Sequence, residues 1–216
     1  MGLILNMGQY MNNIKYLIRR IIFKLSFFSS FREFMALYSI KRRLNDDDIE
    51  KMSKKCGVLE SLYCNYRLTD GTALGLYREG GFIPHDDDID IDILNATDEQ
   101  IIGLKNKMEM RIVREVVLNK KTQQIAFCDK EGFIFDLVFW YQENEFIFNY
   151  CEKGYERIQN IKFFKDLNSI NFRGKQYPMP GAIEEWLEMR YGNDWRVPKT
   201  YKGDWKEECF DMKRIG

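Results

Sequence analysis

Aspartates recur at every second position from Asp86 to Asp92, and isoleucines separate the last three. Side chains two residues apart on a strand share a face, so these carboxylates are predicted to gather along one edge. Two carboxylates about 7 Å apart repel by about 2 kcal/mol at an effective dielectric of about 20, and a hard cation reverses that sign. The spacing predicts a site for one or two Mg²⁺ or Mn²⁺ ions. The side chains that could line this edge as ligands are those of Asp86, Asp88, Asp90 and Asp92.

Two other interpretations of this acidic run are weaker. A solvated acidic loop needs no strict Asp-Ile alternation, whereas burial of the isoleucine face would fix the register and aim the acids. An EF-hand loop counted from Asp88 places Glu99 at its twelfth position. Its sixth position would then be Ile93, where a turn glycine is required. A metal-bearing strand accounts for the pattern better than either alternative.

A third carboxylate is expected from Asp136, which stands alone in the apolar run from Gly132 to Trp140. A lone aspartate in such a strand must be paired, hydrogen-bonded or metal-bound to be tolerated. Metal binding is the favoured interpretation. The alternative is a buried partner for an arginine or for backbone amides.

Upstream of the acidic run, Asp70-Gly71-Thr72 is predicted to form a strand-to-helix turn. Such a turn offers backbone N–H groups and a hydroxyl to a phosphate, and Gly71 has no side chain to block the approach. Arg78 is a second candidate for phosphate binding, although a surface ion pair with Glu79 or Asp70 would also explain it.

The elements that must position these residues follow from periodicity and capping signals. Apolar residues at helical spacing after Asn45 predict a helix, Asp88–Leu94 a strand, and Thr97 with Gln100 a capping box. The predicted helices span about 47–64, 73–78, 97–110 and 182–191. The predicted strands span about 66–69, 88–94, 112–118, 123–128, 133–139 and 170–177, the last being stopped by the prolines at 178 and 180.

Composition narrows the function classes. The 216 residues carry 33 basic and 33 acidic side chains, so no global positive field favours nucleic acid as a partner. One histidine and five widely spaced cysteines make a zinc site improbable and predict reduced, buried thiols in a cytoplasmic protein.

The beginning of the chain is basic. Its cations interrupt the apolar stretches, so no run of eighteen apolar residues that could span a membrane is present. The sequence predicts an N-terminal basic amphipathic helix within an arm of residues 1–45, followed by a catalytic domain of residues 46–216. The arm either packs on the domain or a partner, or lies on an anionic membrane surface through residues 10–43, at the inner face of the membrane.

Five segments together resemble the LicD family of phosphocholine transferases, which is related to fukutin and fukutin-related protein. Gly71–Arg78 and Gly81–Ile91 carry the densest match, and Phe135–Val138, Arg173–Pro180 and Tyr191–Pro198 look like further family blocks. The resemblance spans roughly residues 47 to 200 and leaves the basic arm uncovered.

This resemblance implies an α+β nucleotidyltransferase fold of the DNA polymerase β type, with a mixed sheet flanked by helices. Gly71 and Thr72 match the phosphate-binding turn, Asp88 and Asp90 the paired metal ligands, and Asp136 the third ligand. Two positions depart from the family pattern. His85 replaces a usual tryptophan in the expected substrate wall, and Asp92 adds a carboxylate where a small residue is usual. Either Asp86 or Asp92 could therefore join the paired ligands.

By resemblance, the donor is a CDP-linked alcohol such as CDP-choline or CDP-ribitol, and the acceptor is a glycan hydroxyl in a cell-surface polysaccharide or lipopolysaccharide. Tyr191 and Trp195 are candidates for stacking on the base or sugar, or else they pin the end of their helix. One alternative is a nucleotidyltransferase that moves NMP from an NTP to a small molecule such as an aminoglycoside. Another is a catalytically silent metal-binding partner subunit.

Overall fold

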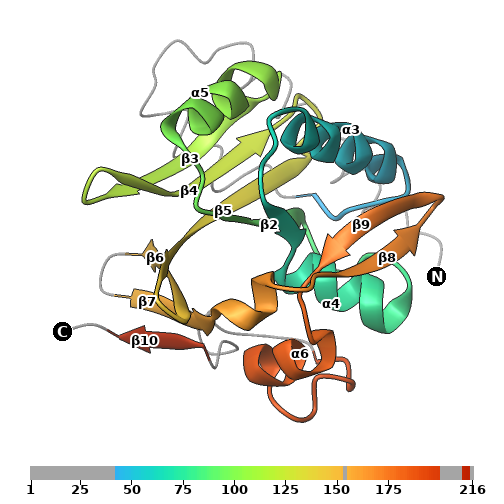
Figure 1. Ribbon diagram of the computed structural model, residues 1–216. Coiled ribbons are helices and arrows are strands. Elements are labelled where there is room, and N and C mark those ends of the chain that lie inside the picture. The colour runs from blue at the N-terminus through green and yellow to red at the C-terminus, as the bar shows by residue number, and fades with distance from the viewer. Residues whose placement is uncertain (1–41, 153–154, 200–210, 215–216) are drawn as a thin grey trace.

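The computed structural model describes residues 42–152, 155–199 and 211–214 (Figure 1). The amphipathic helix expected in residues 10–43 lies outside these ranges except for its last two residues. Residues 42–45 have no regular secondary structure and contact the domain, since the amide of Leu44 donates to the carbonyl of Asp86 at 2.9 Å. The division into an arm and a domain at residue 45 stays a prediction.

The described part contains both helices and strands in the α+β order that the sequence predicts. The helices are α3 (Asp47–Ser61), α4 (Asp70–Glu79), α5 (Asp98–Lys107) and α6 (Ile183–Tyr191), with the 3₁₀ helix η1 (Ile161–Phe164). The strands are β1 (Tyr66–Leu68), β2 (Asp88–Leu94), β3 (Arg111–Leu118), β4 (Lys121–Cys128), β5 (Ile134–Glu143), β6 (Phe146–Glu152), β7 (Tyr155–Asn160), β8 (Asn168–Phe172), β9 (Lys175–Met179) and β10 (Met212–Arg214).

Eight strands form one mixed sheet in the order β1-β2-β5-β6-β7-β10, and β4 joins it beside β5 and carries β3. The pair β2 and β5 is parallel, and the other pairs are antiparallel. Strand β5 is the centre of the sheet: it pairs with β4 as far as Val138, with β2 as far as Trp140, and with β6 from Tyr141 onward. The mixed sheet flanked by helices confirms the predicted fold class.

The Asp-Ile alternation produces the buried strand that the sequence predicts. The side chains of Ile89, Ile91 and Ile93 are fully buried in the main core, which also contains residues of α3, α4 and β5. Burial of that face fixes the register of β2 against β5, because a one-residue slip would expose every isoleucine. The core therefore determines which residues of β5 face the carboxylates of β2.

Helices α3 and α5 lie next to each other in Figure 1 and cover one side of the sheet. The predicted capping box of α5 is confirmed: Thr97 Oγ1 accepts from the amide of Gln100, and Gln100 Oε1 accepts from the amide of Thr97. The side-chain amide of Gln100 also donates to the carbonyl oxygens of Leu62 and Tyr63 just after α3. One cap thus joins the ends of two helices.

The single strand predicted over residues 170–177 is wrong, because this segment is a hairpin of β8 and β9. Arg173 and Gly174 have φ angles of 51° and 84°, in the left-handed region that a tight hairpin turn requires. Strand β9 also continues through Pro178, which was expected to end it. Proline is tolerated there because a two-stranded hairpin leaves one edge of each strand without a ladder bond.

The described cysteines agree with the prediction of reduced thiols. Cys56, Cys64 and Cys128 are buried and form no disulfide within the described residues. Burial raises the pKa of the Cys56 thiol to about 12 and that of Cys64 to about 11. Both side chains therefore act as small apolar core groups at neutral pH.

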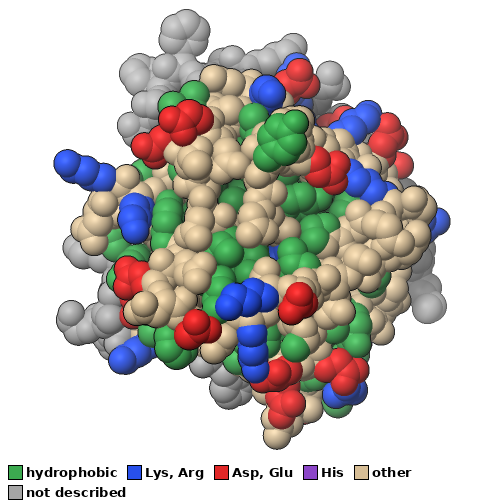
Figure 2. All heavy atoms as spheres, viewed as in Figure 1, with side chains coloured by type: hydrophobic (Ala, Val, Ile, Leu, Met, Phe, Trp, Pro, Cys, Tyr) green, Lys and Arg blue, Asp and Glu red, His purple; other side chains and the backbone are tan. Residues whose placement is uncertain are grey.

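On the face drawn in Figure 2, acidic and basic side chains are interspersed, and hydrophobic side chains show between them. The coloured residues of this face form no continuous basic stripe of the kind that follows a nucleic-acid backbone. Among the described helices, none has the length and apolarity needed to cross a bilayer.

Candidate active site

Three aspartates predicted as metal ligands meet at the junction of β2 and β5. Asp90 lies directly opposite Asp136 in the parallel pair, and Asp88 precedes Asp90 by two residues on the same face. One carboxylate oxygen from each of the three lies within 4.8 Å of the other two. Residues separated by about fifty positions in sequence are therefore brought into one cluster of oxygen ligands.

Asp86 forms a second, overlapping cluster with Asp87 and Asp88, also within 4.8 Å. The position of Asp86 depends on Gly71: a Cβ atom added to Gly71 would overlap with the Asp86 carboxylate. Gly71 therefore lets an acidic side chain approach the first turn of α4, in addition to the access for phosphate expected from sequence.

The first turn of α4 and the residue before it hold the backbone of Asp90 from both sides. The amide of Asp90 donates to Thr72 Oγ1 at 2.9 Å, and the carbonyl of Asp90 accepts from the amide of Thr69 at 3.1 Å. Thr72 is 1% exposed, so its hydroxyl links β2 to α4. Its predicted contact with phosphate stays a prediction.

The carboxyl group of Asp90 has a strongly raised pKa. Burial is the largest cause, and the negative charges of Asp88, Asp70, Asp86 and Asp136 add to it. A divalent cation among these oxygens would supply the missing positive charge. An all-oxygen ligand set with this excess of negative charge fits Mg²⁺ or Mn²⁺, and the candidate ligands are Asp88, Asp90 and Asp136, with Asp86 beside them.

Asp92 does not belong to this cluster, although it follows Asp90 on the same face. Its Oδ2 accepts from Nε and Nη2 of Arg67 at 3.0 and 2.8 Å, and both side chains are fully buried. Arg67 also donates to the carbonyl of Phe163 and to Gln159 Oε1. The expectation that Asp92 could line the metal edge is therefore wrong, because a buried arginine from β1 pairs with it.

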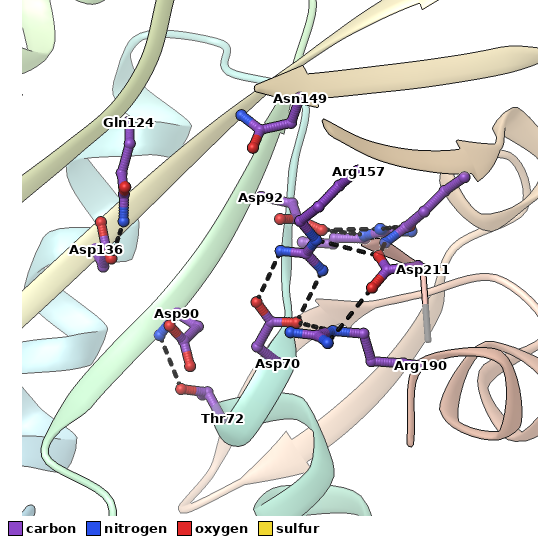
Figure 3. A network of polar contacts seen from close by, with 12 residues as sticks. Asp70, Thr72, Asp90, Asp92, Gln124, Asp136, Asn149, Arg157, Arg190 and Asp211 are labelled. Carbon is purple, nitrogen blue, oxygen red and sulfur yellow. Dashed lines mark hydrogen bonds and ion pairs between the residues drawn. The ribbon is translucent and has the colours of Figure 1, made fainter. Parts of the chain in front are cut away.

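Asp70 is the centre of a cluster of two arginines and two aspartates (Figure 3). Both terminal nitrogens of Arg157 donate to its carboxylate, at 3.0 and 3.1 Å, and Arg190 Nε donates at 2.7 Å. Asp211 accepts from Arg157 Nε at 3.1 Å and lies 3.4 Å from Arg190. Burial alone would raise the pKa of Asp70, but the two guanidinium charges outweigh it and hold that pKa well below its usual value.

A cavity of about 390 Å³ connects the carboxylate cluster with this arginine cluster. Its lining includes the predicted site residues Gly71, Arg78, His85, Tyr191 and Trp195 together with the four aspartates predicted as ligands. Thr72 is the predicted site residue that does not line it. The structure therefore brings the predicted metal and phosphate groups to one cavity, and their roles stay predictions.

Arg78 and Trp195 have further contacts that bear on their predicted roles. Arg78 donates to Glu79, as the surface-pair alternative expected, and to the carbonyl of Trp195 at 2.9 Å. Trp195 is 5% exposed and packs 5.9 Å from the ring of Tyr77. Most of the indole is thus engaged in packing at the end of α6. Trp186, expected in the core, is fully buried and donates to Gln159.

Sequence reasoning missed several residues of this cavity. Arg114, Gln124, Arg157, Arg190 and Lys199 line it, and none was proposed as a site residue. For Gln124 and Arg190, the available signal was a polar residue at a position where burial is expected. Arg190 falls on the apolar stripe of α6, and a buried polar group needs a partner. For Arg157 no local signal existed, since its partners are 87 and 54 residues away.

Two curated relatives have the same printed description, ribitol-5-phosphate transferase FKTN. The protein of Mus musculus is 27% identical over 164 residues, which cover 68% of this chain and 32% of the relative. The protein of Homo sapiens is 24% identical over 197 residues, which cover 84% of this chain and 39% of the relative. The chain thus spans about a third to two fifths of the length of these relatives.

Among solved structures, a lincomycin-bound lincosamide antibiotic adenylyltransferase LnuA aligns with a TM-score of 0.48 at 13% identity, covering 68% of this chain and 86% of that one. The family model described as "LicD/FKTN/FKRP, nucleotidyltransferase domain" matches residues 64–182, more than half of the 216 residues. These residues include β2, β5 and the turn before α4. The chain with this carboxylate cluster is a member of the LicD family and contains its nucleotidyltransferase domain.

Proposed function

We propose that this chain transfers a phospho-alcohol group, of the ribitol-phosphate or phosphocholine type, from a CDP-linked donor to a glycan hydroxyl. The observation that carries the proposal is the meeting of Asp88, Asp90 and Asp136 at a cavity that also contains the N-terminus of α4. Membership of the LicD family and the printed activity of the curated relatives support this choice of reaction.

In this reaction the acceptor hydroxyl oxygen forms a bond to the phosphorus that carries the alcohol. The bond from that phosphorus to the bridging oxygen breaks, CMP leaves with the electron pair, and the hydroxyl proton passes to a base. Asp136, or a neighbouring aspartate not bound to metal, is the candidate base. Asp88, Asp90 and Asp136 would hold Mg²⁺ or Mn²⁺, which would supply positive charge against the phosphate oxygens.

The remaining groups of the cavity would bind and orient the donor. Asp70 and Gly71 at the start of α4 line the cavity, where the unpaired N–H groups and the dipole of a helix N-terminus would favour an anion. Arg78 would exchange its bond to Glu79 for a donor phosphate, to which its planar guanidinium can donate two parallel hydrogen bonds. His85 and Tyr191 are candidates for contacts with the base or sugar.

Ligand-dependent melting of the full chain tests the donor class. With Mg²⁺ or Mn²⁺ at fixed concentration, CMP and CDP-alcohols are expected to raise the melting temperature more than AMP, GMP or UMP. Incubation with CDP-ribitol or CDP-choline and glycan acceptors should then release CMP. A preference for ATP with release of pyrophosphate would favour nucleotidyl transfer to a small molecule and would overturn the proposal.

The metal requirement is tested separately from the donor. Mn²⁺ added to chelator-treated protein should raise the melting temperature, and Asp136→Asn should shift the midpoint of that titration to higher metal concentration. A protein that binds no metal and turns over none of these donors would match the alternative of a silent partner subunit.

A further inference from the structure

Gln124 on β4 lies next to Asp136 because of the register of β4 against β5. In the antiparallel pair of β4 and β5, Ala126 is opposite Asp136 and Gln124 is opposite Val138. Gln124 is two residues from Ala126, so it shares a face with Asp136 and is its diagonal neighbour. The small side chain of Ala126 leaves room for the two longer side chains to meet over it. Figure 3 shows the amide pointing at the carboxylate.

The contact between these two side chains is short and largely buried. Gln124 Nε2 donates to Asp136 Oδ2 at 2.5 Å, and the two residues are 7% and 9% exposed. Gln124 Oε1 accepts no hydrogen bond from the described residues, so the side chain directs its donor to Asp136. The reverse orientation of the amide would set two oxygens against each other.

An aspartate in a ligand cluster needs such a contact because its terminal torsion is soft. Rotation about the Cβ–Cγ bond has broad minima, so packing of the strand fixes the Cβ atom of Asp136 and leaves the direction of its oxygens open. A hydrogen bond to one oxygen selects the rotation and thereby the direction of the other oxygen. Partners of this kind behind a metal ligand typically change metal affinity by about 10- to 100-fold.

We propose that Gln124 is a positioning residue that orients the Asp136 carboxylate for the divalent cation; this inference rests on the metal-dependent function proposed above. Gln124 acts through Asp136. Its loss therefore lowers metal affinity without removing a ligand atom.

The same strand offers a matched control. Gln123 is also a buried glutamine of β4, at 1% exposure, but it faces the other side of the sheet. Its Oε1 accepts from the amide of Tyr150 at 3.0 Å, and its Nε2 donates to the carbonyl of Lys121. Gln123→Met and Gln124→Met each replace a buried amide by an unbranched apolar side chain of similar length.

The experiment measures the melting temperature of chelator-treated full-length protein against Mn²⁺ concentration without nucleotide. Gln124→Met is expected to raise the midpoint of the titration about 10- to 100-fold, whereas Gln123→Met leaves the midpoint unchanged. Gln124→Asn, whose amide is one methylene too short to reach Asp136, provides a second variant if the first does not fold. An unchanged midpoint in the folded Gln124 variant overturns the inference.

A double-mutant cycle with Asp136→Asn separates positioning from general destabilisation. If Gln124 acts through Asp136, Gln124→Met adds little to the midpoint shift already caused by Asp136→Asn. Additive shifts would show an independent effect and would overturn the inference. If Asp136→Asn shifts the midpoint and the Gln124 variants do not, this inference alone fails. If Asp136→Asn leaves the midpoint unchanged, the proposed metal site fails with it.

Discussion

Neighbouring aspartates on β2 have opposite environments. Asp90 lies among four other carboxylates, whereas Asp92, two residues further on, is bonded to a buried arginine. In the sequence, each of these two residues is an aspartate between two isoleucines. The difference arises from β1, where Arg67 stands directly opposite Asp92 in the antiparallel register.

For Asp90, we predict that Asp90→Asn abolishes turnover and leaves the metal-free fold intact or slightly more stable. Burial raises the pKa of Asp90 most and repulsion from neighbouring carboxylates adds to it, so an uncharged amide at this position relieves both costs. Asp88→Asn should behave likewise. Melting with and without Mg²⁺ checks both, and metal-induced stabilisation that survives both substitutions would contradict the assignment of these ligands.

For Asp92, the same substitution should have the opposite effect. Asp92→Asn leaves the fully buried Arg67 without its carboxylate, which is expected to lower the free energy of unfolding by about 3 to 5 kcal/mol. The metal midpoint of the folded fraction should not change. Chemical denaturation and Mn²⁺ titration of the same preparation measure both quantities. A shifted Mn²⁺ midpoint in fully folded Asp92→Asn protein would show that Asp92 belongs to the metal site.

At the scale of elements, helix α4 connects the two halves of the cavity, and its glycines mark where it is tightly packed. A Cβ atom at Gly75 would come 2.7 Å from the carbonyl oxygen of Gly81 and 2.9 Å from Ile83, so backbone would have to move. At Gly71 the three nearest atoms all belong to the carboxylate at the end of the Asp86 side chain, which can rotate away.

These contacts predict different outcomes for three glycine-to-alanine variants. Gly75→Ala should destabilise the protein by about 1 to 3 kcal/mol through overpacking. Gly71→Ala should keep most of the stability but displace Asp86 and raise the metal midpoint. Gly57→Ala in α3 is the control, since nothing lies within 4 Å and helix propensity should add about 0.5 to 1 kcal/mol. An unchanged midpoint in Gly71→Ala would exclude Asp86 from the ligand set.

Elements with local signals could be predicted from sequence, and elements defined by distant pairing could not. The alternation in β2 and the capping box of α5 are written in consecutive residues, and both are present in the structure. Strands β6, β7 and β10 were not predicted. Their alternation of apolar and polar residues is weak, and their strand conformation depends on pairing with other strands. The hairpin turn at Arg173–Gly174 was mistaken for strand interior, since one glycine between β-formers does not reveal its φ angle.

The same distinction applies to the candidate site. The carboxylates of β2 and the lone aspartate of β5 are conspicuous in their local surroundings, so they could be proposed from sequence. The partners of Asp70 could not, because Arg157 and Arg190 lie 87 and 120 residues away and reach it only through the fold. Geometry alone identifies Asp70 as the anchor of two arginines.

Across the whole molecule, the cluster around Asp70 joins α4, β7, α6 and the residue before β10. We predict that Asp70→Asn lowers the free energy of unfolding by about 3 kcal/mol at pH 7, because two largely buried arginines lose a charged partner. The exposed pair of Glu50 and Lys54 provides the control, and Glu50→Gln should leave stability unchanged within error.

The pH dependence of the Asp70 effect has a defined sign. The pKa of Asp70 is depressed in the folded protein, so its ionised form contributes stability at every pH above the unfolded value of about 4. That contribution is lost as the pH falls toward the lower folded pKa. The difference in free energy of unfolding between wild type and Asp70→Asn should therefore stay constant from about pH 5 to about pH 8 and shrink below about pH 4. A difference that shrinks near pH 6 would contradict the assignment to Asp70.

The place of Asp211 also has a consequence for synthesis of the chain on the ribosome. The three candidate ligands, α4 and Arg157 all precede residue 160, but Asp211 and β10, which pairs with β7, emerge more than fifty residues later. Translation proceeds at about 5–20 residues per second, so this interval lasts several seconds. During it, Arg157 lacks its second carboxylate and the outer edge of β7 is open. The aspartates of the acidic cluster are thus synthesised before the residue that completes the arginine side of the cavity, and chaperones that cover exposed strand edges can act in that interval.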